Sequence, residues 1–249
     1  MQIPARIISF WHDRSTMPDA IREAQSQSRA NAGVDEFVLA DDDYLREQLR
    51  AAYPPVIEKL YDRIRVPAAR ADLARMVLLH QFGGLYLDAT FVVRRPLMEL
   101  VPEGVEHLFV QRDDNHAARR VPGRASLING LVAAVPGSPV IGRCVDRMLN
   151  NLVDGDFNRR LVHAMGAGVL TSVVDGLSDQ SGMRFVSLES LREEYLDHIR
   201  VEGYSNKWVE QQAEGIIDPA YLHQNARSLE RRWSVGRSLF HLRISRLKL

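Results

Sequence analysis

Cysteine is almost absent from this sequence. The 249-residue chain has a single cysteine, Cys144, which excludes an internal disulfide bond and a zinc site built from several cysteines. Cys144 lies in a stretch of helical composition at 138–153. We therefore expect it to pack as a small hydrophobic residue and not to act as a nucleophile.

An excess of charge of either sign is also lacking. Lys plus Arg and Asp plus Glu each number 32, so the molecule as a whole gives no electrostatic reason to bind nucleic acid. Long apolar runs are missing as well. The nearest, GLVAAVPGSPVIG at 130–142, is broken by two prolines, whereas a membrane-spanning helix needs roughly 18–20 apolar residues. The N-terminus turns polar before an apolar signal core develops, which predicts a cytoplasmic protein.

Strand-like and helix-like segments alternate in the first half of the chain. Their order, β-α-β-α-α-β, predicts an α/β layered fold with a largely parallel sheet. Ligands bind beyond the carboxyl ends of the strands in such sheets, and Trp11 and Asp88 lie at or near such ends. The expected strands cover 5–11, 35–40, 85–93, 106–112 and 183–188, and the expected helices cover 17–31, 41–53, 67–82, 138–153 and 166–177.

No internal repeat, low-complexity tract or linker divides the chain, so we expect one domain. The polar stretch 113–126 is expected to be a solvated loop. Asp41, Asp42 and Asp43 begin an expected helix, and we interpret them as capping and helix-dipole residues in preference to metal ligands.

The C-terminal segment 231–249 is basic and amphipathic. It contains no acidic residue, and its arginines and lysine alternate with apolar side chains. Such a segment can lie on an anionic membrane surface. Alternatively, it forms a last helix that packs on the domain with its basic side in water, and the sequence leaves both possibilities open.

Three charged residues are expected to converge near the middle of the chain. Asp72 and Arg75 are three residues apart in an expected helix and so share one face. The chain then reverses at Gly83 and Gly84, and the next strand brings Asp88 back alongside. A carboxylate in an apolar strand needs a partner. The alternative, a structural Asp72–Arg75 ion pair with Asp88 capping a turn, also fits this spacing.

The block AARADLARMVLLHQFGGLYLDATFVVRRPL resembles the signature of glycosyltransferases with a DXD-containing sugar-binding region, including capsular polysaccharide synthesis proteins. The opening IPARIISFWHD and the segments NGLVAAVPGSPVIGRCVDRM and GAGVLTSVV are similar to further parts of that family. The resemblance covers roughly residues 3 to 175. The residues that carry the central block are Arg70, Asp72, Arg75, Gly83, Gly84, Tyr86 and Asp88.

This resemblance implies a GT-A fold, which is a Rossmann-like nucleotide-binding sheet flanked by helices. It also implies a retaining hexosyltransferase of capsular or other surface polysaccharide synthesis. The donor would be a nucleotide-diphosphate sugar, commonly UDP-linked, and the acceptor a glycan or a lipid-linked glycan. Residues 1–110 would then bind the donor, 111–230 would face the acceptor, and 231–249 would be the basic tail, which suggests peripheral contact with the inner face of the cytoplasmic membrane.

The resemblance also assigns roles to residues. Asp72, Arg75 and Asp88 are the expected catalytic residues. Trp11 corresponds to the aromatic that stacks on the base, and Asn129 is expected near the sugar or acceptor, with turn capping as the alternative. The full expected donor-binding set is Phe10, Trp11, Arg70, Asp72, Arg75, Tyr86, Leu87, Asp88, Ala89 and Asn129.

A divalent cation, Mn²⁺ or Mg²⁺, is implied as cofactor, since it would bridge the phosphates of the donor. Thr90 stands where the family usually has the second DXD aspartate, and a hydroxyl is a weaker ligand for these ions than a carboxylate. Asp88, Thr90 and His223 are the expected metal site, with His241 as the alternative histidine. Both histidines also fit an ordinary surface position.

Two other function classes are compatible with parts of the pattern. The first is a non-catalytic sugar-nucleotide-binding module that kept the fold, which Thr90 favours. The second is a phosphatase of the haloacid-dehalogenase type, whose nucleophilic aspartate also ends an apolar strand. DATFVV lacks the second acid or Gly-Thr of that motif, so the phosphatase is the weaker alternative.

Overall fold

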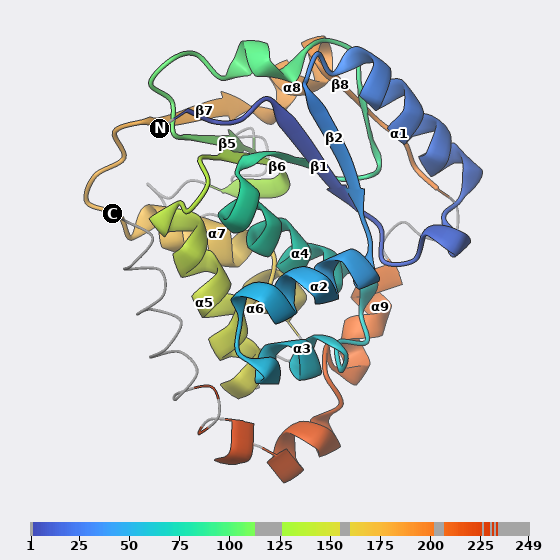
Figure 1. Ribbon diagram of the computed structural model, residues 1–249, viewed down its shortest axis with the longest axis vertical. Coiled ribbons are helices and arrows are strands. Elements are labelled where there is room, and N and C mark those ends of the chain that lie inside the picture. The colour runs from blue at the N-terminus through green and yellow to red at the C-terminus, as the bar shows by residue number, and fades with distance from the viewer. Residues whose placement is uncertain are drawn as a thin grey trace.

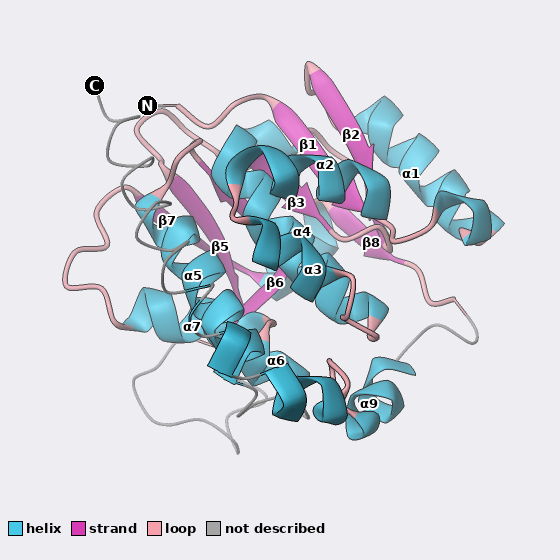
Figure 2. Cartoon of the chain, turned by 60° about the horizontal axis from the view of Figure 1, so that its bottom comes forward, coloured by secondary structure: helices cyan, strands magenta, loops and turns pink. Residues whose placement is uncertain are grey.

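The computed structural model describes residues 2–112, 126–154, 160–201, 207–225, 227–229, 231 and 233. In these residues a six-stranded sheet has the order β2-β1-β3-β6-β5-β7, and a two-stranded sheet pairs β4 with β8. Helices lie on both sides of the larger sheet (Figures 1 and 2). The strands are β1 (Arg6–Phe10), β2 (Glu36–Ala40), β3 (Gly84–Leu87), β4 (Phe91–Val93), β5 (His107–Gln111), β6 (Leu127–Ala134), β7 (Met183–Ser187) and β8 (Leu196–His198).

The largely parallel sheet predicted from the sequence is confirmed, with one strand reversed. β1 pairs in parallel with β2 and β3, and β5 pairs in parallel with β7. β6 is antiparallel to both β3 and β5. The carboxyl ends of β1, β2 and β3 therefore meet at one edge of the sheet, where a ligand site is expected.

The prediction of one strand over 85–93 is wrong. β3 ends at Leu87, residues 89–90 form a turn, and β4 starts at Phe91 in the other sheet. The turn is fixed from outside the segment, because Gln25 and Ser28 of α1 (Asp19–Asn31) donate hydrogen bonds to the carbonyls of Ala89 and Phe91. Asp88 thus follows a strand and does not lie within one.

The helices expected at 17–31, 41–53 and 67–82 are present in the first half of the chain, whereas a further helix at Pro55–Tyr61 was not expected. α4 starts at Pro67, which suits a first helical position because proline lacks the N–H that would be unsatisfied there. It ends before Gly83, whose φ is 63°, a conformation that favours glycine. The helices are α1 (Asp19–Asn31), α2 (Asp42–Ala52), α3 (Pro55–Tyr61), α4 (Pro67–Phe82), α5 (Pro139–Asp154), α6 (Leu161–Ala164), α7 (Ala167–Asp175), α8 (Leu188–Glu194) and α9 (Lys207–Gln211).

Two further expectations about single residues are confirmed. Asp41 caps α2 by accepting a hydrogen bond of 2.9 Å from the Tyr44 amide. Cys144 is fully buried in α5 within the hydrophobic core, and burial raises the pKa of its thiol to about 12. A thiol with that pKa is not a nucleophile at neutral pH.

The strands divide the core into two layers, because alternate residues point to opposite faces of a sheet. Ile8 and Phe10 of β1 pack in the larger layer, which α4 and α5 fill from their side of the sheet. Ile7 points to the other layer, which contains Leu85 and Leu87 of β3. α4 lies directly on the sheet, in contact with β1, β3 and β6 (Figure 1).

The second half of the chain was less predictable. β6 was missed, because its apolar residues run directly into the Pro-Gly turn before α5. The loop predicted at 113–126 lies almost entirely outside the described residues. Of the C-terminal segment, Trp233 is buried and donates from Nε1 to Asn150 of α5 at 2.7 Å. At Trp233 the chain therefore packs on the domain.

None of the helices in the described part of the chain has the length and apolar composition required to cross a bilayer.

Candidate active site

Arg75 links two carboxylates at the carboxyl edge of the sheet. Its Nη1 donates to Asp72 Oδ1 at 2.5 Å and its Nη2 to Asp88 Oδ1 at 2.7 Å. The Asp72–Arg75 ion pair of the structural alternative is therefore present, and Asp88 does precede a turn. The same guanidinium nevertheless holds both acids, so the structure brings the three residues together.

The ring of Tyr86 packs against the guanidinium of Arg75. The guanidinium carbon lies 4.5 Å from the centre of the Tyr86 ring, a cation–π geometry. Burial alone would lower the pKa of Arg75, but the Asp88 carboxylate beside it raises that pKa, so the guanidinium stays charged. Its side chain is only 3% exposed. A buried, charged arginine between two acids is a rigid support for both.

Asp72 and Asp88 differ in their access to water. The Asp72 side chain is 11% exposed and the Asp88 side chain 36%. Burial raises the pKa of Asp72, while Arg75 opposes that shift. Asp88 is the more accessible acid and can meet a ligand that arrives from solvent.

The backbone around Asp88 forms a tight turn. The Asp88 amide donates to the Gly130 carbonyl at 2.8 Å, which extends the β3–β6 pairing by one residue, and its carbonyl accepts from the Phe91 amide at 3.0 Å. The carboxyl group therefore leaves the sheet at a fixed point. This turn is the DAT sequence, in which Thr90 stands two residues after Asp88.

Asn129 joins the same group from β6. Its Nδ2 donates to Asp72 Oδ1 at 2.8 Å. The turn-capping alternative for Asn129 is wrong, because the residue lies inside a strand. Its place close to the two acids agrees with the expectation that it lies near the sugar, although the role itself stays a prediction.

Two glycines beside the acids were missed in the sequence. Gly130 adjoins Asp88 Oδ2, and Gly166, just before α7, adjoins Asp72 Oδ2. A glycine inside a strand of β-forming residues often marks a close approach of another group. Gly130 in LINGLVAA carries that signal.

Of the other expected donor-binding residues, Trp11 lies beside the DAT turn, whereas Phe10 and Leu87 are core residues. Trp11 is half-buried and packs with Ala89 and with Ile21 of α1. Phe10 and Leu87 are buried in the core. Leu87 contributes its carbonyl, which accepts a hydrogen bond of 2.8 Å from the Ser9 hydroxyl and fixes β3 to β1.

Arg70 belongs to a separate cluster. Its guanidinium is bound to Asp42, and its Nε donates to the Ile64 carbonyl at 2.9 Å. Asp42 also accepts a hydrogen bond from Tyr61, at 2.5 Å. The structure thus gives Arg70 a supporting place between α2 and α4, away from the Arg75 group, and its contact with a donor stays a prediction.

The expected metal ligands are not all gathered. Thr90 lies in the turn after Asp88, whereas His223 is exposed on a helical segment at 219–225, and His241 lies outside the described residues. In the described part of the chain, no three His, Cys, Asp or Glu side chains group as a metal site. A cation here would depend on Asp88, the Thr90 hydroxyl and oxygens of the ligand itself.

His198, which the sequence did not single out, lies in the neighbourhood of Asp88. β8 pairs with β4 so that His198 is opposite Phe91, and their rings meet edge to face at 5.3 Å. Burial lowers the pKa of His198, and the charge of Asp88 acts in the opposite direction. Only the pairing of β8 with β4 reveals this neighbour, because Asp88 and His198 are far apart in sequence.

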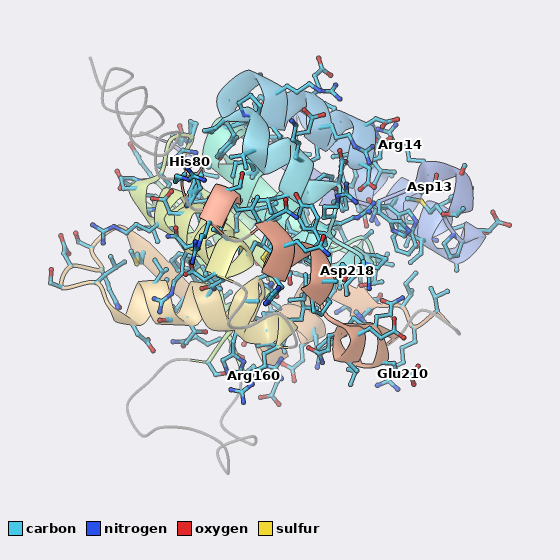
Figure 3. The ribbon with its side chains drawn as sticks, turned by 90° about the horizontal axis from the view of Figure 1, so that it is seen from below. Asp13, Arg14, His80, Arg160, Glu210 and Asp218 are labelled. Atoms are coloured by element: carbon cyan, nitrogen blue, oxygen red, sulfur yellow. The ribbon has the colours of Figure 1, made fainter. Side chains whose placement is uncertain are left out.

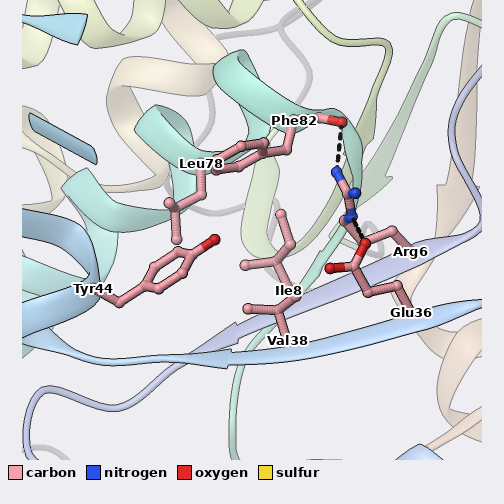
Figure 4. A pocket seen from close by; sticks show the side chains of 7 residues that line it. All are labelled: Arg6, Ile8, Glu36, Val38, Tyr44, Leu78 and Phe82. Atoms are coloured by element: carbon pink, nitrogen blue, oxygen red, sulfur yellow. Dashed lines mark hydrogen bonds and ion pairs between the residues drawn. The ribbon is translucent and has the colours of Figure 1, made fainter. Parts of the chain in front are cut away.

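A small cavity at the opposite edge of the sheet is a poor alternative site. It has a volume of about 60 Å³ and is lined by residues at the start of β1 and β2 and the end of α4, including Arg6, Glu36 and Phe82 (Figure 4). Ligand pockets for organic molecules measure roughly 300–1,000 Å³. Arg6 is also occupied, since it binds Glu36 and the Phe82 carbonyl.

The surface next to Trp11 is polar. Arg14 forms an ion pair of 2.7 Å with Asp41, and Asp13 accepts hydrogen bonds from Ser15. Figure 3 shows Asp13 and Arg14 close together, on the other side of the view from His80. The carboxyl edge of the sheet thus carries the buried acid–arginine group and a charged outer rim.

Comparison with known proteins gives consistent results. Residues 8–105 match the family model described as "Glycosyltransferase sugar-binding region containing DXD motif". A protein of Acanthamoeba polyphaga mimivirus named as an uncharacterized glycosyltransferase is 30% identical over 100 residues. That alignment covers 40% of this chain and 37% of the viral protein, so the chain spans little more than a third of the length of that curated relative.

Among solved structures, "PaToxG Glycosyltransferase" superposes with a TM-score of 0.51 at 14% identity, over 92% of this chain and 78% of that one. The glycosyltransferase domain of the YGT toxin, solved with UDP, superposes with a TM-score of 0.37 at 11% identity, over 63% of this chain and 55% of that one. The first of these shows that the fold is the GT-A-like fold predicted from the sequence.

Proposed function

Residues 8–105 match the DXD-containing sugar-binding region of glycosyltransferases, and on that premise we propose that this protein transfers a hexose from a nucleotide-diphosphate sugar to a glycan or lipid-linked acceptor. The observation that carries the proposal is the bridge from Arg75 to Asp72 and Asp88 at the carboxyl edge of the sheet. The glycan or lipid-linked nature of the acceptor and the assignment of residues 111–230 to the acceptor side are part of the proposal, as is the single domain.

The geometry suits the binding of a sugar joined to a diphosphate. Asp72 is buried and held by both Arg75 and Asn129, so its carboxylate is fixed well enough to accept hydrogen bonds from sugar hydroxyls. Arg75 holds both acids through hydrogen bonds of 2.5 and 2.7 Å. Such preorganised charge stabilises a transition state better than groups that must first reorient.

We infer that Asp88 serves the diphosphate end of the donor. Its Oδ1 is held by Arg75, while its Oδ2 has no hydrogen-bond partner among the described residues. A divalent cation bound with donor phosphates needs only one or two protein carboxylates, so Asp88 with the Thr90 hydroxyl fits a cation site of low intrinsic affinity. When bound, Mn²⁺ or Mg²⁺ would neutralise charge on the departing diphosphate.

Finer properties of the reaction follow from the resemblance alone. These are a UDP-linked donor, retention at the anomeric carbon and a place in capsular or other surface polysaccharide synthesis.

Peripheral contact of residues 231–249 with the inner face of the cytoplasmic membrane also belongs to the proposal. Burial of Trp233 supports packing of at least that part of the tail. Unchanged binding to anionic vesicles after deletion of residues 234–249 would remove the membrane proposal.

The experiment is a panel of UDP-, GDP- and CMP-sugars with Mn²⁺, in which release of the nucleotide is followed with and without acceptors. We expect turnover with one donor and its loss, by about 100- to 1,000-fold, in Asp88→Asn. Asp19→Asn is the matched control, because Asp19 has a 94% exposed side chain at the start of α1. Full activity of Asp88→Asn would contradict the proposal.

A non-catalytic binding module is the second candidate. The observation that favours it is the DAT turn, which leaves one carboxylate where the family has two. The same panel separates the two candidates, since a module would show a ligand-dependent rise in melting temperature and no turnover with any donor. A phosphatase would instead release phosphate from aryl phosphates and form an acyl-phosphate at Asp88.

A further inference from the structure

The backbone conformation at Gly130 does not require a glycine. It lies inside β6 and is not among the glycines with a positive φ. Glycine in a strand interior is destabilising by roughly 0.5–1 kcal/mol relative to alanine. Another reason must therefore favour glycine at this position.

The reason lies in the neighbours of Gly130. A Cβ atom at residue 130 would lie 2.8 Å from Asp88 Oδ2 and 2.9 Å from Phe91 Cε2. Carbon and oxygen atoms that are not bonded do not approach this closely, so at least one of these groups would have to move. The Asp88 carboxylate occupies the space that a side chain would otherwise fill.

The backbone cannot open to make room. The Asp88 amide donates to the Gly130 carbonyl, and the neighbouring residues Leu87 and Leu131 are paired in the β3–β6 ladder. Phe91 is 6% exposed and is packed in the core with the His198 ring against it. The Asp88 side chain is the most exposed of these groups and would be the one to rotate.

We propose that Gly130 is a positioning residue, whose missing side chain leaves room for Asp88 Oδ2 while Oδ1 stays on Arg75 Nη2, so that the carboxylate keeps the orientation required for the donor diphosphate. This inference rests on the proposed transferase function. Any side chain at residue 130 displaces the carboxylate from Arg75 Nη2, from which it now accepts a hydrogen bond of 2.7 Å. The donor then meets a misplaced charge in an otherwise intact site.

Gly166 gives a useful contrast. A Cβ there would lie 3.2 Å from Asp72 Oδ2 but also 3.1 Å from the Val162 Cα. Since a backbone atom is involved, Gly166→Ala is expected to disturb the chain before α7 as well as the acid. Gly130→Ala is the cleaner test, because its strain falls mainly on one movable side chain.

The experiment compares Gly130→Ala with Gly176→Ala in the nucleotide-release assay. Gly176 has a φ of −82°, and a Cβ there meets nothing closer than 3.4 Å. We expect kcat/KM to fall about 100-fold in Gly130→Ala, since a displacement of about 1 Å of a catalytic group can cost that much, and to stay unchanged in Gly176→Ala. Both variants should bind the free nucleoside equally well.

A double variant shows whether Gly130 acts through Asp88. In an Asp88→Asn background, Gly130→Ala should cause little further loss, because coupled residues are not additive. The same loss in both backgrounds would overturn the inference, and so would wild-type activity of Gly130→Ala.

A crystal structure of Gly130→Ala tests the inference independently of activity. If the wild-type protein turns over no donor, the proposed function fails, but this structure still shows whether Gly130 positions Asp88. We expect the Asp88 carboxylate to have left Arg75. A carboxylate that stays within hydrogen-bonding distance of Arg75 would overturn the inference.

Discussion

Asn129 of β6 donates a hydrogen bond of 2.8 Å to Asp72 of α4, across 57 positions of sequence. The contact means that Asp72 is held from two sides, by the strand and by Arg75 of its own helix. These two hydrogen bonds fix the orientation of the Asp72 carboxylate.

Loss of this amide should weaken the site more than the fold. In Asn129→Ala we expect donor turnover to fall about tenfold, with a stability loss of about 1 kcal/mol for the missing hydrogen bond. Asn31→Ala is the matched control, since Asn31 donates a comparable bond of 2.9 Å to the Val93 carbonyl. Steady-state kinetics and chemical denaturation of both variants measure the two effects, and equal turnover in the two would contradict the role of Asn129.

Arg75→Lys should break the bridge while keeping the positive charge. A lysine ammonium lacks the planar fork with which the guanidinium reaches Asp72 and Asp88 together. We expect a loss of about 2–4 kcal/mol in the free energy of unfolding, because one acid is left without its partner in a buried site. Urea denaturation measures this loss, and a stable, fully active Arg75→Lys would show that the bridge is dispensable.

Thr90→Asp should increase affinity for Mn²⁺ or Mg²⁺. The substitution places a second carboxylate two residues after Asp88, in the turn where the family's second acid usually stands, and carboxylates bind these ions better than a hydroxyl does. Titration calorimetry with Mn²⁺ in the presence of the nucleotide diphosphate is the measurement. Thr16→Asp, on the exposed stretch before α1, is the control; equal Mn²⁺ affinity in wild type and Thr90→Asp would place the cation elsewhere.

The buried His107–Ser138 pair should make stability depend on pH. His107 Nε2 lies 2.6 Å from the Ser138 hydroxyl, whose oxygen also accepts a hydrogen bond from the Ile141 amide. Burial lowers the pKa of His107 from 6.5. As the pH falls below about 6.5 the unfolded chain binds a proton that the folded chain does not, and stability is lost, by at most about 1.4 kcal/mol per pH unit.

His107→Gln should reduce that loss between pH 7.5 and pH 5. The comparison is with His223→Gln, because His223 is exposed. Urea denaturation at several pH values measures the slopes. If His107→Gln and wild type lost stability equally as the pH falls, His107 would not be a source of the dependence.

Much of the first half of the fold could be predicted from local signals. Pro67 and Gly83 mark the two ends of α4, and the spacing of Asp72 and Arg75 places them on one face. The return of the chain through Gly83 and Gly84 was enough to predict that Asp88 comes back to that helix. These features depend on residues close in sequence, which is why the sequence contains them.

The remaining features depend on partners that are distant in the chain. The division of 85–93 into β3 and β4 is set by β6 on one side and β8 on the other. Arg70 is bound by Asp42, 28 residues earlier, so the local motif could not predict that its guanidinium already has a carboxylate partner. Asn129 and Gly130 lie in a strand whose apolar run resembled part of a longer hydrophobic segment.

The most direct test of the central claim is a comparison of two affinities in wild type, Asp72→Asn and Asp88→Asn. Titration calorimetry measures binding of the nucleotide sugar and of the nucleotide diphosphate alone, each with Mn²⁺. If Asp72 holds the sugar and Asp88 serves the diphosphate, Asp72→Asn weakens binding of the nucleotide sugar only, and Asp88→Asn weakens both. Wild-type affinities for both ligands in both variants would contradict the account.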